Sequence, residues 1–290
     1  MALVLAALRR RGAACWFLDQ HAALSTSIEL EVGDAVEGTV RIGARALMLK
    51  TVTAAFIRPY DGRRIPAVQR AGDAAGCHAT ALDDAMATWA DLAPALVVNR
   101  PAAMAPNGSK PYQAELIRAA GMEVPDTLVT TDQRAARAFV ARHGRVVYKA
   151  VSGVRSVVSR LGPEHRERLG DLATCPTQFQ AFVPGIDVRA HVVGGRVFAC
   201  RIDADEDDYR YPRHGDVRIS RLDPGDDVAE RWVRLTAGMG LHVAGIDLRL
   251  RPDGAWVCFE VNPSPAFSFY QEATEDPIDE AVAELLVHAA

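Results

Sequence analysis

One predicted hairpin constrains the fold of this chain more than any other stretch. Residues 245–265 read GIDLRLRPDGAWVCFEVNPSP, in which two apolar runs flank Asp253-Gly254, a dipeptide typical of two-residue hairpin loops. Such a loop fixes which residues face each other, and one face of the predicted hairpin becomes wholly apolar. The facing pairs on it are Leu250 with Val257, Leu248 with Phe259, and Ile246 with Val261.

The opposite face of the predicted hairpin carries two acids. In this register Asp247 lies directly opposite Glu260, and Asn262 shares their face because it follows Glu260 by two residues. Like charges at facing positions destabilise a sheet unless a cation lies among them. Two carboxylates and an amide oxygen suit Mg²⁺, with Mn²⁺ as a substitute. A solvent-exposed pair on an edge strand, neutralised by Arg249 and Arg251, is the alternative.

Two lysines are candidates for contacts with phosphate. Lys149 interrupts the apolar strand VVYKAV just before the small-residue turn SGVRS, and Lys110 lies in a Gly-Ser-Lys-Pro loop. A lysine that points inward from a buried strand needs a partner. Each also fits an ordinary surface position. The chain contains neither a Walker loop nor a GxGxxG motif.

The remainder of the chain alternates helix and strand signals, which predicts an α/β fold. We expect a helix over residues 2–11 and a buried strand over 15–19. A break rich in proline and glycine, RPAAMAPNGSKP, covers residues 100–111 and indicates a domain boundary. The predicted domains are an α/β domain over 1–99, a central lobe over 100–175 and a C-terminal lobe with the metal site over 176–290.

Charge and composition exclude several classes of protein. Lys and Arg number 33 against 37 Asp and Glu, for a net charge of -4, so the basic excess of nucleic-acid binders is missing. No apolar run approaches the roughly 20 residues of a membrane span, and arginines follow rather than precede the apolar start at 2–8, unlike in a signal peptide. The 5 cysteines form no CxxC pair, and we expect them to be buried thiols. These features predict a cytoplasmic protein that binds neither nucleic acid nor membrane.

Taken together, four stretches resemble the ATP-grasp superfamily. They are NGSKPYQAELIRAAGMEVPDT (107–127), VVYKAVSG (146–153), QFQAFVPGIDVRAHVVGGRVFA (178–199) and GIDLRL with FEVNPSP. The resemblance covers residues 100–290 and is strongest to RimK-type amino-acid ligases and to the ATP-grasp ligases of microviridin-type (graspetide) peptides. It implies a three-lobed ATP-grasp fold, with residues 1–99 as the preceding α/β domain.

The resemblance also implies roles for individual residues. Where the family has Arg-Ser-Asn this chain has Arg210, Tyr211 and Pro212, and its loop SGVRSVVSRL is poorer in glycine than the usual phosphate-covering loop. The implied roles are phosphate contacts for Lys110 and Lys149, the adenine edge for the hinge from Gln180 through Phe182 to Val183, the ribose for Asp187, the nucleotide for Arg210, and Mg²⁺ ligation for Asp247, Glu260 and Asn262.

Two arginines are the candidate catalytic residues, because an ATP-dependent ligase concentrates negative charge on the transferring oxygens. Arg189 and Arg201 lie on strands that we expect to face one cleft; salt bridges to Asp187, Asp203 or Asp205 are the alternative for both. The resemblance implies that ATP activates a carboxylate as an acyl phosphate, which an amine or a hydroxyl then attacks. A peptide or an amino acid is the expected substrate, and a homodimer is one compatible assembly. A nucleotide-binding subunit without activity and a phosphotransferase remain as alternatives.

Overall fold

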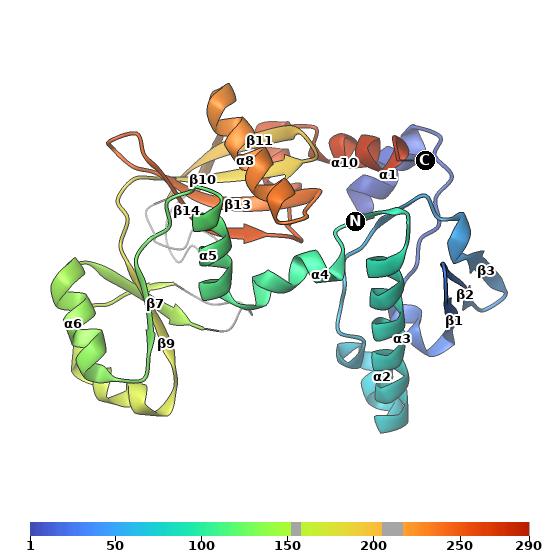
Figure 1. Cartoon of the computed structure of the whole chain (residues 1–290), viewed down its shortest axis with the longest axis horizontal. Helices are drawn as coiled ribbons and strands as arrows, with labels where there is room; N and C mark the ends of the chain where they lie inside the picture. Colours follow the sequence, from blue (N-terminus) through green and yellow to red (C-terminus); the bar gives the residue numbers. More distant parts are fainter. Residues whose placement is uncertain (152–157, 205–216, 290) are drawn as a thin grey trace. The chain divides into compact units, whose positions relative to one another are not determined.

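The computed structural model describes residues 1–151, 158–204 and 217–289. The chain divides into two units. Unit 1 consists of Met1–Met104, Gly240–His242 and Pro277–Ala290, and unit 2 consists of Ala105–Met239 and Val243–Asp276. Both units combine helices with sheets (Figure 1), so the predicted α/β class is confirmed. No helix in the described part of the chain has the length and apolar character that a membrane span requires.

Unit 1 contains two small sheets and a long helix, α3 (Asp73–Leu92), which packs against the first of them. β1 (Thr26–Val32), β2 (Val36–Ile42) and β3 (Arg45–Met48) are antiparallel, whereas β4 (Ala54–Phe56) and β5 (Leu96–Val98) pair in parallel. The other α-helices of unit 1 are α1 (Ala2–Arg10), α2 (Pro66–Ala71), α4 (Pro101–Met104) and α10 (Ile278–Val287).

Arg100 closes the C-terminal end of α3. The last carbonyl groups of a helix have no partner within the helix, and here a guanidinium supplies the donors. Arg100 donates four hydrogen bonds of 2.7–3.0 Å, which go to the carbonyl oxygens of Ala90, Asp91, Ala93 and Ala95. The positive charge also opposes the partial negative charge at this end of the helix.

Some expectations for local structure are wrong. The predicted helix is present as α1, but residues 13–19 have no regular secondary structure, and in the expected strand only Trp16 and Leu18 pack toward the core. Among the cysteines, Cys200 and Cys258 are buried as expected, whereas three are exposed. The exposed ones are Cys15, Cys77 and Cys175.

Unit 2 contains a four-stranded and a five-stranded sheet. The first has the order β6 (Thr127–Thr130), β9 (Thr177–Ala181), β7 (Val146–Ala150) and β8 (Ser159–Arg160). The second has the order β12 (Arg218–Arg221), β11 (Arg196–Asp203), β10 (Ile186–Val193), β13 (Val243–Leu250) and β14 (Trp256–Asn262). The α-helices of unit 2 are α5 (Lys110–Ala119), α6 (Gln133–His143), α7 (Pro163–Glu167), α8 (Asp226–Gly238) and α9 (Ser268–Thr274).

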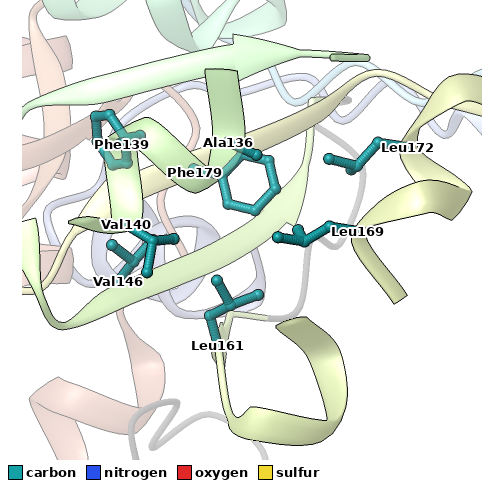
Figure 2. Packing of buried hydrophobic residues seen from close by; sticks show 8 residues of the cluster. All are labelled: Ala136, Phe139, Val140, Val146, Leu161, Leu169, Leu172 and Phe179. Atoms are coloured by element: carbon teal, nitrogen blue, oxygen red, sulfur yellow. The ribbon is translucent and has the colours of Figure 1, made fainter. Parts of the chain in front are cut away.

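One face of the four-stranded sheet is a hydrophobic core. Phe179 of β9 lies among side chains of α6 and of the segment that follows β8 (Figure 2). Because side chains alternate along a strand, Gln178 and Gln180 point to the other face. Lys149 shares that face, since it pairs directly with Gln178.

The five-stranded sheet also has two unlike faces. Val188, Ile246 and Leu248 are at most 2% exposed, and α8 packs against β10 and β11. The alternate positions carry polar side chains, which we call the polar face. It comprises Asp187, Arg189, His191, Asp247, Arg249, Glu260 and Asn262.

Candidate active site

The hairpin of β13 and β14 keeps the predicted pairing at the acids. Asp247 pairs with Glu260, but between Asp247 and the loop the register is shifted by one residue. The loop has three residues, 252–254, with Gly254 at φ +84°, and a β-bulge at Phe259 restores the predicted register. The corrected pairs are Leu248 with Cys258, Arg249 with Val257, and Leu250 with Trp256.

Each acid on the polar face contacts a basic side chain of the same unit. Asp247 and Glu260 were expected to need a cation between them, and Arg189 and Lys110 supply positive charge to them. Both basic side chains are less than one-tenth exposed, so water screens these pairs weakly. The pairs are Arg189 Nη1 with Asp247 Oδ1 at 2.6 Å, Lys110 Nζ with Glu260 Oε1, and Arg249 Nη2 with Asp187 Oδ1.

The alternative prediction, that Arg249 and Arg251 neutralise Asp247 and Glu260, is wrong. Arg249 pairs with Asp187, and its Nη1 donates to the carbonyl oxygen of Val183 at 2.8 Å. Arg251 binds Glu123 at 3.0 Å and Asp253 at 2.6 Å. Neither of these arginines neutralises the facing acids of the hairpin.

The donor set at the acids fits a hard divalent cation. Arg189 pairs with Asp247 through Oδ1, and Lys110 pairs with Glu260 through Oε1. Asn262 lies next to these carboxylates and accepts the Ser264 amide at Oδ1, at 2.9 Å. Among the described residues, no group of three or more His, Cys, Asp or Glu could hold a metal ion. A cation here needs further oxygen atoms, which is how Mg²⁺ binds with water and phosphate.

Lys149, predicted to contact phosphate, and Gln180, predicted to contact adenine, lie on the face of the four-stranded sheet opposite its hydrophobic core. Lys149 and Gln178 are direct neighbours across β7 and β9, and Gln180 donates from Nε2 to Thr127 Oγ1 at 3.1 Å. Gln178 is 2% exposed, and its Oε1 accepts no hydrogen bond in the described chain. Gln178 was not identified from the sequence, where its only signal is a polar residue at an inward position of a strand.

The hinge after β9 is held from two sides. The Phe182 amide donates to the Arg145 carbonyl oxygen at 3.0 Å, and the Arg145 guanidinium lies 3.7 Å from the centre of the Phe182 ring. Arg249 ties this hinge to β10, because it bonds both Val183 O and Asp187. The predicted adenine and ribose residues are thus brought together by Arg249, which the sequence analysis had assigned to another role.

The two candidate catalytic arginines lie on opposite faces of the five-stranded sheet. Arg189 pairs with Cys200, whereas Arg201 pairs with Val188, and directly paired side chains share a face. Arg201 binds Asp203 through Nε at 2.8 Å and Nη2 at 2.6 Å. The expectation that both arginines face one cleft is therefore wrong. Arg210 lies outside the described residues.

His191 packs beside Arg189 and was not identified from the sequence. It is 1% exposed, and burial, with a smaller effect of Arg189, lowers its pKa to about 3. The ring lies 5.0 Å from that of Tyr270, and Nε2 lies 3.3 Å from the Ala266 carbonyl oxygen. Tyr270 also lies beneath the Arg189 guanidinium, 5.7 Å away. A neutral imidazole and an aromatic ring therefore enclose the arginine that binds Asp247.

Comparison with known proteins identifies the family. The family model described as a RimK-like ATP-grasp domain matches residues 110–286. The chain belongs to this family. The match includes both sheets of unit 2 and every predicted site residue.

Solved structures of ATP-grasp enzymes share the fold. The macrocyclase MdnC from Microcystis aeruginosa MRC, bound with the precursor peptide MdnA, is 22% identical with a TM-score of 0.83, over 100% of this chain and 96% of that chain. The ATP-grasp ligase PsnB, complexed with minimal precursor, Mg and ADP, is 28% identical with a TM-score of 0.80, over 99% and 93% of the chains. The D-Ala:D-Ser ligase VanG from Enterococcus faecalis is 17% identical with a TM-score of 0.55, over 70% and 68%. A comparison with curated proteins gave no match.

Membership of the RimK-like ATP-grasp family confirms three expectations. The fold is that of the ATP-grasp enzymes. The enzyme class is an ATP-dependent, ADP-forming ligase. ATP and Mg²⁺ are the cofactors of this class.

Proposed function

We propose that this protein is a peptide ligase that activates a carboxylate side chain of a precursor peptide with ATP and joins it to an amine or a hydroxyl. One observation carries the proposal: PsnB, solved with its minimal precursor, Mg and ADP, aligns with 99% of this chain at 28% identity. MdnC, solved with its precursor peptide, supports the same fold over the full length. An amino-acid substrate remains the second candidate, because the family model is that of the RimK-like domain.

Asp247, Glu260 and Asn262 would hold Mg²⁺, as their oxygen donors fit it. The bound ion would neutralise charge on the phosphate oxygens during transfer. Lys110 would then move from Glu260 to a phosphate oxygen, because both groups are anionic and Lys110 is already within contact of the acid. Lys149 would contact a second phosphate from β7.

The hinge residues would hold the nucleoside. Gln180, Phe182 and Val183 would contact the adenine, and Asp187 would accept hydrogen bonds from the ribose hydroxyls. Asp187 is bound by Arg249 from the neighbouring strand β13. Arg210 is proposed as a further nucleotide contact on the strength of the family resemblance.

Arg189 is the proposed catalytic arginine. It is 5% exposed and bonded to a proposed metal ligand, so its planar donors lie beside the place where charge develops on the carboxylate and the phosphoryl group. Arg201 is left out of the proposed site, because its pairing with Val188 directs it to the other face. We also propose that residues 1–99, 100–175 and 176–290 are the three lobes of the enzyme.

The test is a reaction of the protein with ATP, Mg²⁺ and a panel of peptides encoded beside its gene, with free amino acids in parallel. We expect ADP release and a peptide product that has lost water. A product that retains the phosphoryl group would indicate a phosphotransferase. Nucleotide binding without ADP release from any substrate would indicate a subunit without activity.

A further inference from the structure

Gly245 lies on β13 within the polar face, two residues before Asp247. It pairs with His191 on one side and with Asn262 on the other. Its φ is outside the left-handed region, so the backbone conformation does not require a glycine. The space around it does.

The Arg189 side chain occupies the position that a Cβ at residue 245 would need. An ideal Cβ there would lie 2.0 Å from Arg189 Nη2, 2.5 Å from Arg189 Cζ and 2.7 Å from Pro265 Cβ. Ordinary contacts of a Cβ begin at 3.4 Å. Any larger residue at 245 must therefore displace the guanidinium by about 1 Å or more, since atoms in a packed interior cannot overlap.

The Arg189 side chain reaches Asp247 through the space that the missing Cβ of Gly245 leaves free. Arg189 pairs directly with Asp247 and is the diagonal neighbour of Gly245 across β10 and β13. The guanidinium lies over Gly245, with the Tyr270 ring and His191 beside it, and reaches Asp247 Oδ1 at 2.6 Å. Since Arg189 is 5% exposed, it has little room to take another path.

We infer that Gly245 is a positioning residue, which by its missing Cβ sets the guanidinium of Arg189 against Asp247. The inference rests on the proposed function, in which Arg189 is catalytic. A displacement of about 1 Å at a reacting centre can lower the rate by about 10²-fold. The strand partners of Gly245 are His191 and Asn262, not the hinge residues proposed to hold the nucleoside, so we expect the loss in kcat and not in the KM for ATP.

The experiment compares Gly245→Ala, Arg189→Ala and their combination with a matched control, Gly195→Ala. Gly195 lies in the turn between β10 and β11, where a Cβ has no neighbour within 4 Å. We expect Gly245→Ala to lower kcat about 10²-fold with the KM for ATP within about threefold of wild type. In the Arg189→Ala background the same substitution is expected to have no further effect on kcat, because the two residues act as one unit. The control is expected to retain wild-type kcat.

Thermal unfolding provides a second readout that does not depend on activity. Gly245→Ala is expected to lower Tm by less in the Arg189→Ala background than in wild type, because Arg189→Ala removes the guanidinium atoms that the new Cβ would clash with. Equal Tm shifts in both backgrounds, multiplicative losses of kcat, or wild-type kcat in Gly245→Ala would each overturn the inference and leave the proposed function intact. Wild-type kcat in Arg189→Ala would instead refute the proposed role of Arg189, and the inference with it.

Discussion

Replacement of Lys110 by methionine is expected to tighten binding of a divalent cation to the nucleotide-free protein. In the structure the ammonium group of Lys110 occupies one side of Glu260, so a metal ion must compete with it for the carboxylate. Methionine has a similar length and no charge. The variant therefore presents Glu260 without an internal counter-ion, while Asp247 keeps Arg189.

The size of the effect follows from the burial of the pair. The Lys110 side chain is 9% exposed and that of Glu260 is 22% exposed. Solvent-exposed ion pairs contribute about 0.2–1 kcal/mol, and one with a nearly buried cation contributes more, so we take about 1–2 kcal/mol. In Lys110→Met the metal ion no longer competes with this pair, so the Kd for the metal ion should tighten about 5- to 30-fold.

The assay is titration of Mn²⁺ with detection of the free ion by electron paramagnetic resonance, without nucleotide. Lys149→Met is the matched control, since it removes the same charge from a lysine that is not paired with Glu260 in the described structure. Since Lys149 lies on β7 of the four-stranded sheet and Glu260 on β14 of the five-stranded sheet, the control should change the Kd by less than about threefold. Equal tightening in both variants, or none in Lys110→Met, would refute the proposed competition at Glu260.

Other substitutions test separate parts of the structure. Asp187→Ala should raise the KM for ATP about tenfold with little change in kcat, since the ribose is remote from the reaction; a fall in kcat alone would contradict this. Arg201→Met should leave both parameters within about twofold of wild type, and a large loss of kcat would return Arg201 to the site. The pKa of His191 is about 3 in the folded protein and 6.5 as its ordinary value, so the unfolded chain takes up the proton first and stability falls as the pH drops below 6.5. Between pH 7 and pH 5, the free energy of unfolding from chemical denaturation should fall by about 2 kcal/mol more in wild type than in His191→Gln. Equal losses in the two proteins would contradict this. Arg100→Met should lower the free energy of unfolding by about 2–4 kcal/mol, because it leaves helix carbonyls without donors; an unchanged urea midpoint would refute that role.

The sequence predicted the pairs of Asp247 with Glu260 and of Ile246 with Val261 correctly, and the pairs between Asp247 and the loop incorrectly. Asp253-Gly254 is compatible with a two-residue loop and also with the end of a three-residue loop, which is the one that forms. That extra loop residue shifts the register, and the bulge at Phe259 shifts it back before Glu260. Two irregularities of one residue each compensate at the acids, and local preferences alone do not reveal them.

The other error concerned the face of the sheet to which the side chains of a strand point. Alternation along a strand shows which residues share a face, but only pairing with a neighbour shows which face that is. Arg201 was placed with Arg189 without that register. The roles of Gly245 and Arg249 depend on contacts across strands, at residues that no local pattern distinguishes from their neighbours.

The most direct test of the ligase assignment follows the oxygen atom that a carboxylate loses. A peptide substrate labelled with oxygen-18 in its side-chain carboxylate is converted with ATP and Mg²⁺, and the released phosphate is analysed by mass spectrometry. Activation as an acyl phosphate predicts ADP together with phosphate that carries one labelled oxygen. Unlabelled phosphate, or AMP with pyrophosphate in place of ADP, would contradict the account.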